Sequence, residues 1–126
     1  MHNKVKHVSA CMYNVWGSSE CCIGDICKKL EEKLNKEKAT VIGAPQIVTS
    51  DNDSGSVLLC VVIPYLPNSN SGHIEVKYSF TPCDYCALQE FSVEEIISDY
   101  PVSIQIINHS ISDYRRILAM WTETTK

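Results

Sequence analysis

The sequence lacks the segments that would place it in or across a membrane. No apolar stretch approaches the roughly 18 residues that a membrane-spanning helix needs. No apolar run with a cleavage site stands near Met1, so a secretory signal is not indicated. Internal repeats and low-complexity tracts are also missing. We therefore expect the 126 residues to form one domain, residues 1–126, with no membrane partner.

An excess of basic residues is missing too. Eleven Lys and Arg stand against 15 Asp and Glu, which gives a formal net charge of -4. This balance provides no overall attraction to nucleic acid, so single-stranded nucleic acid is a disfavoured partner and an unidentified protein partner is favoured. The richest group of lysines, in residues 28–38, is interleaved with glutamates and is expected to be the solvated face of a helix.

Cysteine, in contrast, is abundant. The chain has seven cysteines, at positions 11, 21, 22, 27, 60, 83 and 86. Without a signal for secretion, reduced thiols or a metal site are favoured over a disulfide framework, and the expected location is intracellular and cytoplasmic. Cys27 and Cys60 lie within apolar patterns and are expected to be small core residues.

The hydrophobic pattern of the first half predicts a strand, a helix and further strands. Residues 5–13 read as a strand, and the spacing of apolar residues predicts an amphipathic helix over 19–37, which Ser18 or Ser19 can cap. Residues 39–48 suit a short strand or hairpin, and 49–56 a polar loop. Residues 57–66 are continuously apolar, which fits a buried strand or a buried helix equally well.

The second half alternates predicted strands with predicted helices. After a loop at 67–72, residues 74–80 alternate as a half-buried strand that ends at Pro82. Helices are expected from Cys83 to Phe91, from there to about Tyr100, and again over 112–121, with a strand at 102–108 between them. Strands that alternate with helices indicate a layered α/β domain.

The pair Cys83 and Cys86 is the candidate metal site. It stands where the strand ending at Pro82 meets a predicted helix, and residues three apart on a helix lie on one face. The helix N-terminus favours thiolates, so both sulfurs can bind one Zn²⁺. A redox pair and two merely packed cysteines remain alternatives to this possible two-cysteine zinc site.

The residues around this pair resemble the AID/APOBEC family of polynucleotide cytidine deaminases. The resemblance covers residues 74–121, and its sharpest part is Ser79-Phe80-Thr81-Pro82-Cys83 followed by Cys86 and Ala87. It implies a three-layer α/β/α cytidine deaminase-like fold with a mixed central sheet. It also implies a zinc ion held in part by Cys83 and Cys86.

The other half of the family's signature, His-x-Glu, does not stand where the family has it. His73-x-Glu75 precedes Pro82 by too few residues for the required helix and strand, and belongs to the strand that delivers Pro82. The family register instead places Gly55 and Val57 at the positions of the histidine and the glutamate. No glutamate occurs between Lys38 and Gly72, so no catalytic residue is assigned.

Three functions follow as hypotheses. The first is a degenerate, non-catalytic deaminase-like domain that acts by interaction with a protein or a nucleic acid. The second is an active zinc-dependent cytidine deaminase with an atypical site that uses Asp53, His73 or His109. The third is a flavodoxin-like or TIR-like α/β interaction domain. A helix at 57–66 favours the deaminase fold, and a central parallel strand favours the third hypothesis.

Overall fold

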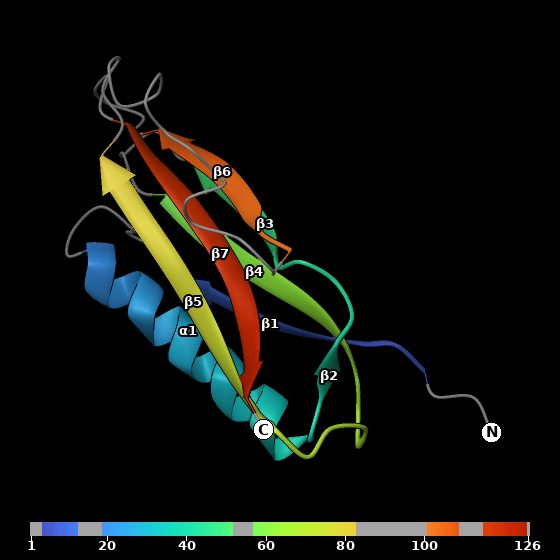
Figure 1. Cartoon of the computed structure of the whole chain (residues 1–126). Helices are drawn as coiled ribbons and strands as arrows, with labels where there is room; N and C mark the ends of the chain where they lie inside the picture. The colour runs from blue at the N-terminus through green and yellow to red at the C-terminus, as the bar shows by residue number, and fades with distance from the viewer. Residues whose placement is uncertain (1–3, 13–18, 52–56, 83–100, 109–114, 126) are drawn as a thin grey trace.

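The described chain forms two antiparallel sheets that face each other, with one helix along one side (Figure 1). This computed structural model describes residues 4–12, 19–51, 57–82, 101–108 and 115–125. The elements run in the order β1 (Lys6–Met12), α1 (Ser19–Lys36), β2 (Thr40–Val41), β3 (Gln46–Asp51), β4 (Val57–Leu66), β5 (His73–Pro82), β6 (Ser103–Asn108) and β7 (Arg115–Thr125).

Each sheet is built around one long central strand. In sheet A, β4 pairs with β1 on one side and with β2 and β3 on the other. In sheet B, β7 lies between β5 and β6. Every pairing is antiparallel, so the described elements form a β-sandwich with a single helix.

The predicted three-layer α/β/α fold with a mixed central sheet is therefore wrong. Residues 57–66 form the central strand of an antiparallel sheet, which supports neither the deaminase fold nor a parallel flavodoxin-like sheet. The helix predicted over 112–121 is also wrong, because Arg115–Thr125 is strand β7. Its residues Ile117, Leu118, Ala119 and Met120 are all buried, and a strand covered on both faces gives a continuous apolar run without a period of two.

Several other predictions are confirmed. The helix expected over 19–37 is α1, and the strands expected at 5–13, 74–82 and 102–108 are β1, β5 and β6. Residues 39–48, expected as a short strand or hairpin, hold two short strands, β2 and the start of β3, which both pair with β4 and so form no hairpin with each other. Strand β3 continues to Asp51 into the predicted loop. The two helices predicted between Cys83 and Tyr100 lie outside the described residues.

The core lies between the two sheets and is completed by α1. Side chains of β4 alternate, so that Leu59, Val61, Ile63 and Tyr65 point inward and are buried. Sheet B contributes Ile74, Val76, Leu118 and Met120 from the opposite side. The predicted apolar stripe of α1 is confirmed as part of this core: Ile23, Ile26, Cys27, Leu30 and Leu34 are all buried.

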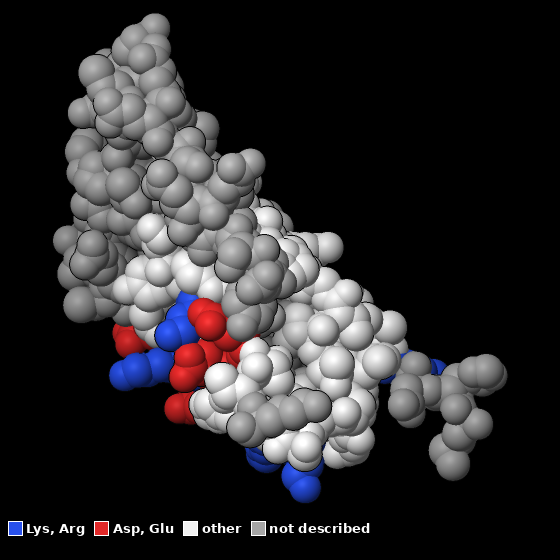
Figure 2. All heavy atoms as spheres, in the orientation of Figure 1, with Lys and Arg blue, Asp and Glu red and all other residues white. Residues whose placement is uncertain are grey.

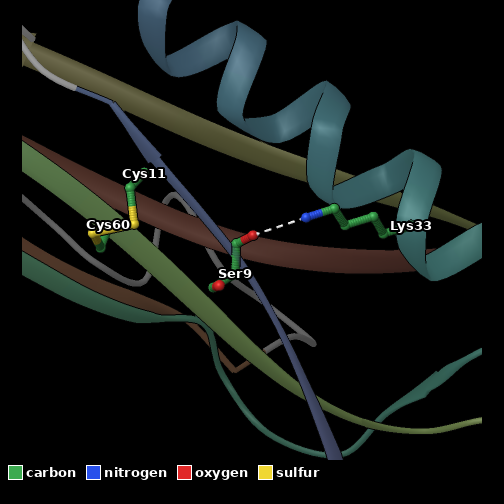
Figure 3. Close-up of a disulfide and its surroundings, with 4 residues drawn as sticks. All are labelled: Ser9, Cys11, Lys33 and Cys60. Carbon is green, nitrogen blue, oxygen red and sulfur yellow. Dashed lines mark hydrogen bonds between the residues drawn. A yellow bond between two sulfur atoms is a disulfide. The ribbon is translucent and has the colours of Figure 1, made fainter.

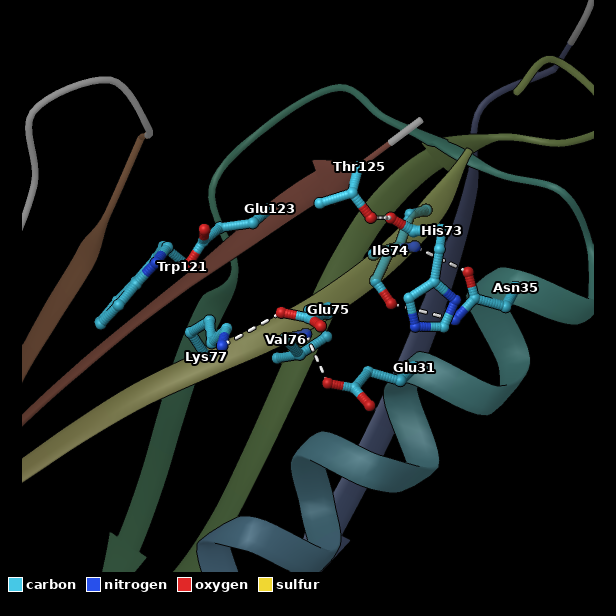
Figure 4. A network of polar contacts seen from close by, with 10 residues as sticks. All are labelled: Glu31, Asn35, His73, Ile74, Glu75, Val76, Lys77, Trp121, Glu123 and Thr125. Carbon is cyan, nitrogen blue, oxygen red and sulfur yellow. Dashed lines mark hydrogen bonds and ion pairs between the residues drawn. The ribbon is translucent and has the colours of Figure 1, made fainter. Parts of the chain in front are cut away.

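Helix α1 fills the gap between β1 and β5, the outer strands of the two sheets (Figure 1). Its side chains bond the strand backbone that no neighbouring strand reaches (Figure 4). Asn35 accepts from the amide of Ile74 at 2.8 Å and donates to the carbonyl of the same residue at 3.0 Å. Glu31 accepts from the amide of Val76 at 2.8 Å. These side chains therefore take the place of a missing strand beside β5.

On the opposite side of the sandwich the two sheets approach each other directly. There β3 approaches β6, and the hydroxyl of Ser103 donates to the carbonyl of Pro45. The two sheets thus meet directly at β3 and β6 and are held apart by α1 at β1 and β5. In the part of the chain that the structure describes, no helix is long and apolar enough to cross a membrane.

We predict that Asn35→Ala destabilises the protein by about 1–3 kcal/mol, because it leaves the Ile74 amide and carbonyl without their partner. The matched control is Glu32→Ala on the exposed side of α1, which is expected to change the free energy of unfolding by less than about 0.5 kcal/mol. Urea unfolding measures both, and hydrogen exchange at Ile74 should quicken only in the Asn35 variant. Equal effects of the two substitutions would contradict this role of Asn35.

Candidate functional site: a groove beside strand β1

The predicted metal ligands lie outside the part of the chain that is described. Cys83 and Cys86 are not among the described residues, and neither are Asp53 and His109 of the atypical deaminase site. Among the described residues, no three His, Cys, Asp or Glu side chains are grouped so that they could hold a metal ion. Zinc binding by Cys83 and Cys86 therefore stays a prediction.

His73 and Glu75 lie where the sequence places them, on the strand that leads to Pro82. Glu75 forms an ion pair with Lys77 at 3.1 Å on the outer face of sheet B (Figure 4). The hydrogen bond and the charge of Glu75 raise the pKa of Lys77 above its ordinary value. Figure 2 shows acidic side chains gathered on this face with basic ones among them. The end of the face at Glu75 and Lys77 is charged and exposed to solvent, which is the ordinary condition of an outer sheet surface.

Two cysteines form a disulfide that the sequence reading did not expect. Cys11 of β1 and Cys60 of β4 are directly opposite in the antiparallel register, with their Cα atoms 4.1 Å apart, and their sulfurs are bonded (Figure 3). Cys60 was predicted to be a core thiol, and this is wrong because it occupies an outward position of β4. The apolar run did not reveal which of its residues face out, since both faces of β4 are apolar.

Cys27 is the buried free thiol that the sequence predicts. It is 4% exposed within the core. Burial raises the pKa of Cys27 from an ordinary value of 9.0 to about 12, and the nearby Glu31 carboxylate adds to the effect. This thiol is therefore a packing residue and a poor nucleophile.

Strand β1 has an edge that no other strand of the described chain covers, because its pairing partner is β4 alone. The carbonyl oxygen of Ser9 points outward from this edge toward α1 and accepts a hydrogen bond from Nζ of Lys33 at 3.2 Å (Figure 3). In an antiparallel strand the residues that face the partner strand alternate with those that face away. The short Cα distance at Cys11 agrees with this alternation, since pairs without ladder hydrogen bonds approach most closely. His7, Ser9 and Cys11 therefore turn their backbone groups to the free edge.

An open groove runs between this edge and the last turns of α1. Its volume is about 530 Å³. The base is formed by the buried side chains of Val8 and Tyr65, and the walls are polar. The wall residues are His7, Ser9, Lys33, Lys36, Glu37 and Asn68.

The helix side of the groove is basic. Lys29, Lys33 and Lys36 are exposed and are spaced by four and three residues, which places them in one row along α1. The ion pairs found among the described residues are Lys6–Glu37, at 3.6 Å, and Lys77–Glu75. Neither involves Lys33 or Lys36, and the first neutralises the groove's carboxylate. A groove with uncompensated positive charge thus exists on a chain whose net charge is -4.

Sequence reasoning found the lysines but not the groove. It described residues 28–38 as a solvated helix face, and the exposure of Lys28, Lys29, Lys33 and Lys36 confirms this. The helical period is the signal that could have shown which lysines lie together. It puts Lys29, Lys33 and Lys36 on one side of α1, and Glu31 and Asn35 on the other. Strand β1 lies beside the lysine side of α1. This contact belongs to the tertiary structure, and no local sequence pattern indicates it.

Comparisons of the chain with models of protein families, with curated proteins and with solved structures found no match.

We predict that loss of the disulfide lowers the free energy of unfolding by about 2–4 kcal/mol, because the bond closes a long loop in the unfolded chain. Cys11 and Cys60 are 49 residues apart in sequence. Urea unfolding of the wild type with and without a reductant measures the effect. A Cys11→Ser, Cys60→Ser variant should match the reduced wild type, and a reductant should then have no further effect. Unchanged stability after reduction would contradict the prediction.

We also predict that Cys27 makes the protein less stable as the pH rises above 9. The unfolded thiol ionises near pH 9 while the folded one keeps its proton up to about 12. Above pH 9 the unfolded state therefore binds fewer protons, and stability falls. The difference in unfolding free energy between wild type and Cys27→Val should shrink by about 1.4 kcal/mol per pH unit in this range. A constant difference from pH 8 to pH 10.5 would contradict the raised pKa.

Proposed function

We propose that this protein is an interaction module that binds an extended, acidic segment of a partner protein along the free edge of β1. The observation that supports this most directly is the groove, which sets a strand edge with unpaired backbone groups beside a row of lysines. An extended peptide that adds to a sheet edge gains backbone hydrogen bonds from the strand and specificity from the flanking side chains.

The backbone of β1 supplies the first part of this recognition. By the alternation along β1, the amides of His7 and Ser9 point away from β4. The hydrogen bond found at this edge among the described residues is the one that the flexible side chain of Lys33 donates to the Ser9 carbonyl. A peptide strand beside β1 would bond these groups and displace the ammonium of Lys33. The edge of β5 is not equivalent, because Asn35 and Glu31 already occupy it.

The lysines supply the second part. An ammonium group displaced from the Ser9 carbonyl remains above the groove, within reach of a carboxylate carried by the bound segment. Lys36 follows on the same side of the helix, so carboxylates at alternate positions of an extended segment meet successive positive charges. A segment that is rich in Asp or Glu is therefore preferred to a neutral or basic one.

A peptide fits the groove better than single-stranded nucleic acid does. Nucleic acid without sequence preference is held by exposed aromatic side chains on which bases stack. The aromatic residue of the groove, Tyr65, is 6% exposed and forms part of the core. The strand edge, in contrast, offers backbone donors and acceptors at the spacing of another peptide strand.

We predict that a labelled ten-residue peptide of alternating Thr and Glu binds the full chain in fluorescence anisotropy, and that the Thr-Lys peptide does not. Lys33→Glu should weaken binding at least tenfold, because it replaces an attractive charge with a repulsive one. The matched control is Lys28→Glu, which makes the same charge change on another side of α1 and should leave affinity nearly unchanged. Added salt should weaken the binding, since the charges are exposed.

Three results would contradict the proposal. They are equal binding of the two peptides, equal loss in the Lys28 and Lys33 variants, and tighter binding of an oligothymidylate than of the acidic peptide. Hydrogen exchange gives a separate readout, because the amides of His7 and Ser9 should become protected only when the acidic peptide is bound.

A further inference from the structure

The outer face of sheet A is uncharged across all its strands. Inward and outward side chains alternate along each strand, so the outward positions are those that stand between the buried ones, and residues paired across two strands lie on the same face. They form rows across the sheet: Cys11–Cys60–Val48, Ser9–Val62–Gln46, His7–Pro64, Leu58–Ser50 and Leu66–Thr40. Among these described positions none is Asp, Glu, Lys or Arg.

The two outer faces of the sandwich therefore differ in kind. Sheet B carries Glu75, Lys77 and Glu123 at one end of its outer face, whereas Ala119 and Ile117 further along β7 on the same face are buried. On sheet A the central strand presents Leu58, Cys60, Val62, Pro64 and Leu66, and Val48 beside it is 58% exposed. A contiguous apolar patch without charge marks a surface that associates, and depletion of charged residues is typical of the centre of an interface.

We infer that this face binds a second copy of the chain, so that two sandwiches stack through their A sheets. A face without charged groups is complementary to itself, because two copies bring no like charges together. A two-fold axis near Cys60 and Val62, at the middle of β4, would place the same rows of both copies against each other. The apolar outward side chains of β4 and Val48 can then pack against their copies with the two sheets about 10 Å apart, as the stacked sheets of a sandwich do.

The area of the face sets the expected strength. Ten residues of β4 extend about 33 Å, and three neighbouring strands span about 14 Å, so each copy covers about 460 Å². The pair then buries close to 1,000 Å² in total, at the lower limit of specific interfaces, so we expect a weak dimer. The β1 groove lies on the side of β1 that faces α1 and shares only His7 and Ser9 with this face, so this inference does not depend on peptide binding.

Sedimentation of the full chain from about 1 to 200 μM tests the dimer. We expect the wild type to convert from monomer to dimer across this range. Val48→Lys should weaken association at least tenfold, because each dimer would then carry an ammonium group from both copies within an apolar contact. The matched control, Ile104→Lys, changes an exposed isoleucine of β6 in sheet B, which is 39% exposed, and should leave association unchanged.

Two outcomes would overturn the inference. One is a wild-type chain that stays monomeric at every concentration. The other is a dimer that Val48→Lys and Ile104→Lys affect equally. Circular dichroism of both variants verifies that they fold, and Ser50→Lys, at an exposed outward position of β3, provides a second disruptive change if Val48→Lys does not fold.

Discussion

The side chains of α1 that replace a missing strand are the interaction on which the architecture depends. A sandwich of two open sheets leaves backbone donors and acceptors on its outer strands, and their burial without partners costs free energy. On one flank Asn35 bonds both backbone groups of Ile74, and on the other Lys33 holds the Ser9 carbonyl. The apolar stripe between these side chains enters the core. One helix therefore fills the interior and completes two strand edges.

The two edges are completed to different degrees, and the proposed function follows from that difference. Beside β5 the bonds are made by short side chains at 2.8 to 3.0 Å and are partly buried. Beside β1 a single exposed lysine reaches across an open groove. The first arrangement is a fixed part of the structure, whereas the second can be exchanged for a ligand at small cost.

The sequence was most informative where one face of an element is polar. The period of α1 and the alternation of β5 were read correctly because Lys, Glu and Ser separate their apolar residues. The readings failed or stayed ambiguous at β7 and β4, where both faces are apolar and a period cannot be seen. The predicted fold class then followed from the helix wrongly predicted at β7, the central strand of sheet B, together with a resemblance centred on Cys83 and Cys86. The groove and the disulfide depend on which strands are neighbours, and a single sequence carries no signal for that.

The position of α1 in the chain has a consequence for misfolding. The helix comes second in the sequence, whereas β5, whose edge it completes, begins more than thirty residues after the helix ends. Until that contact forms, or whenever it opens, the outer strands β1 and β5 present bare edges at once. Fibril growth and exchange of strands between chains both start from such edges. Substitutions that loosen the helix are therefore expected to cause aggregation before they cause global unfolding.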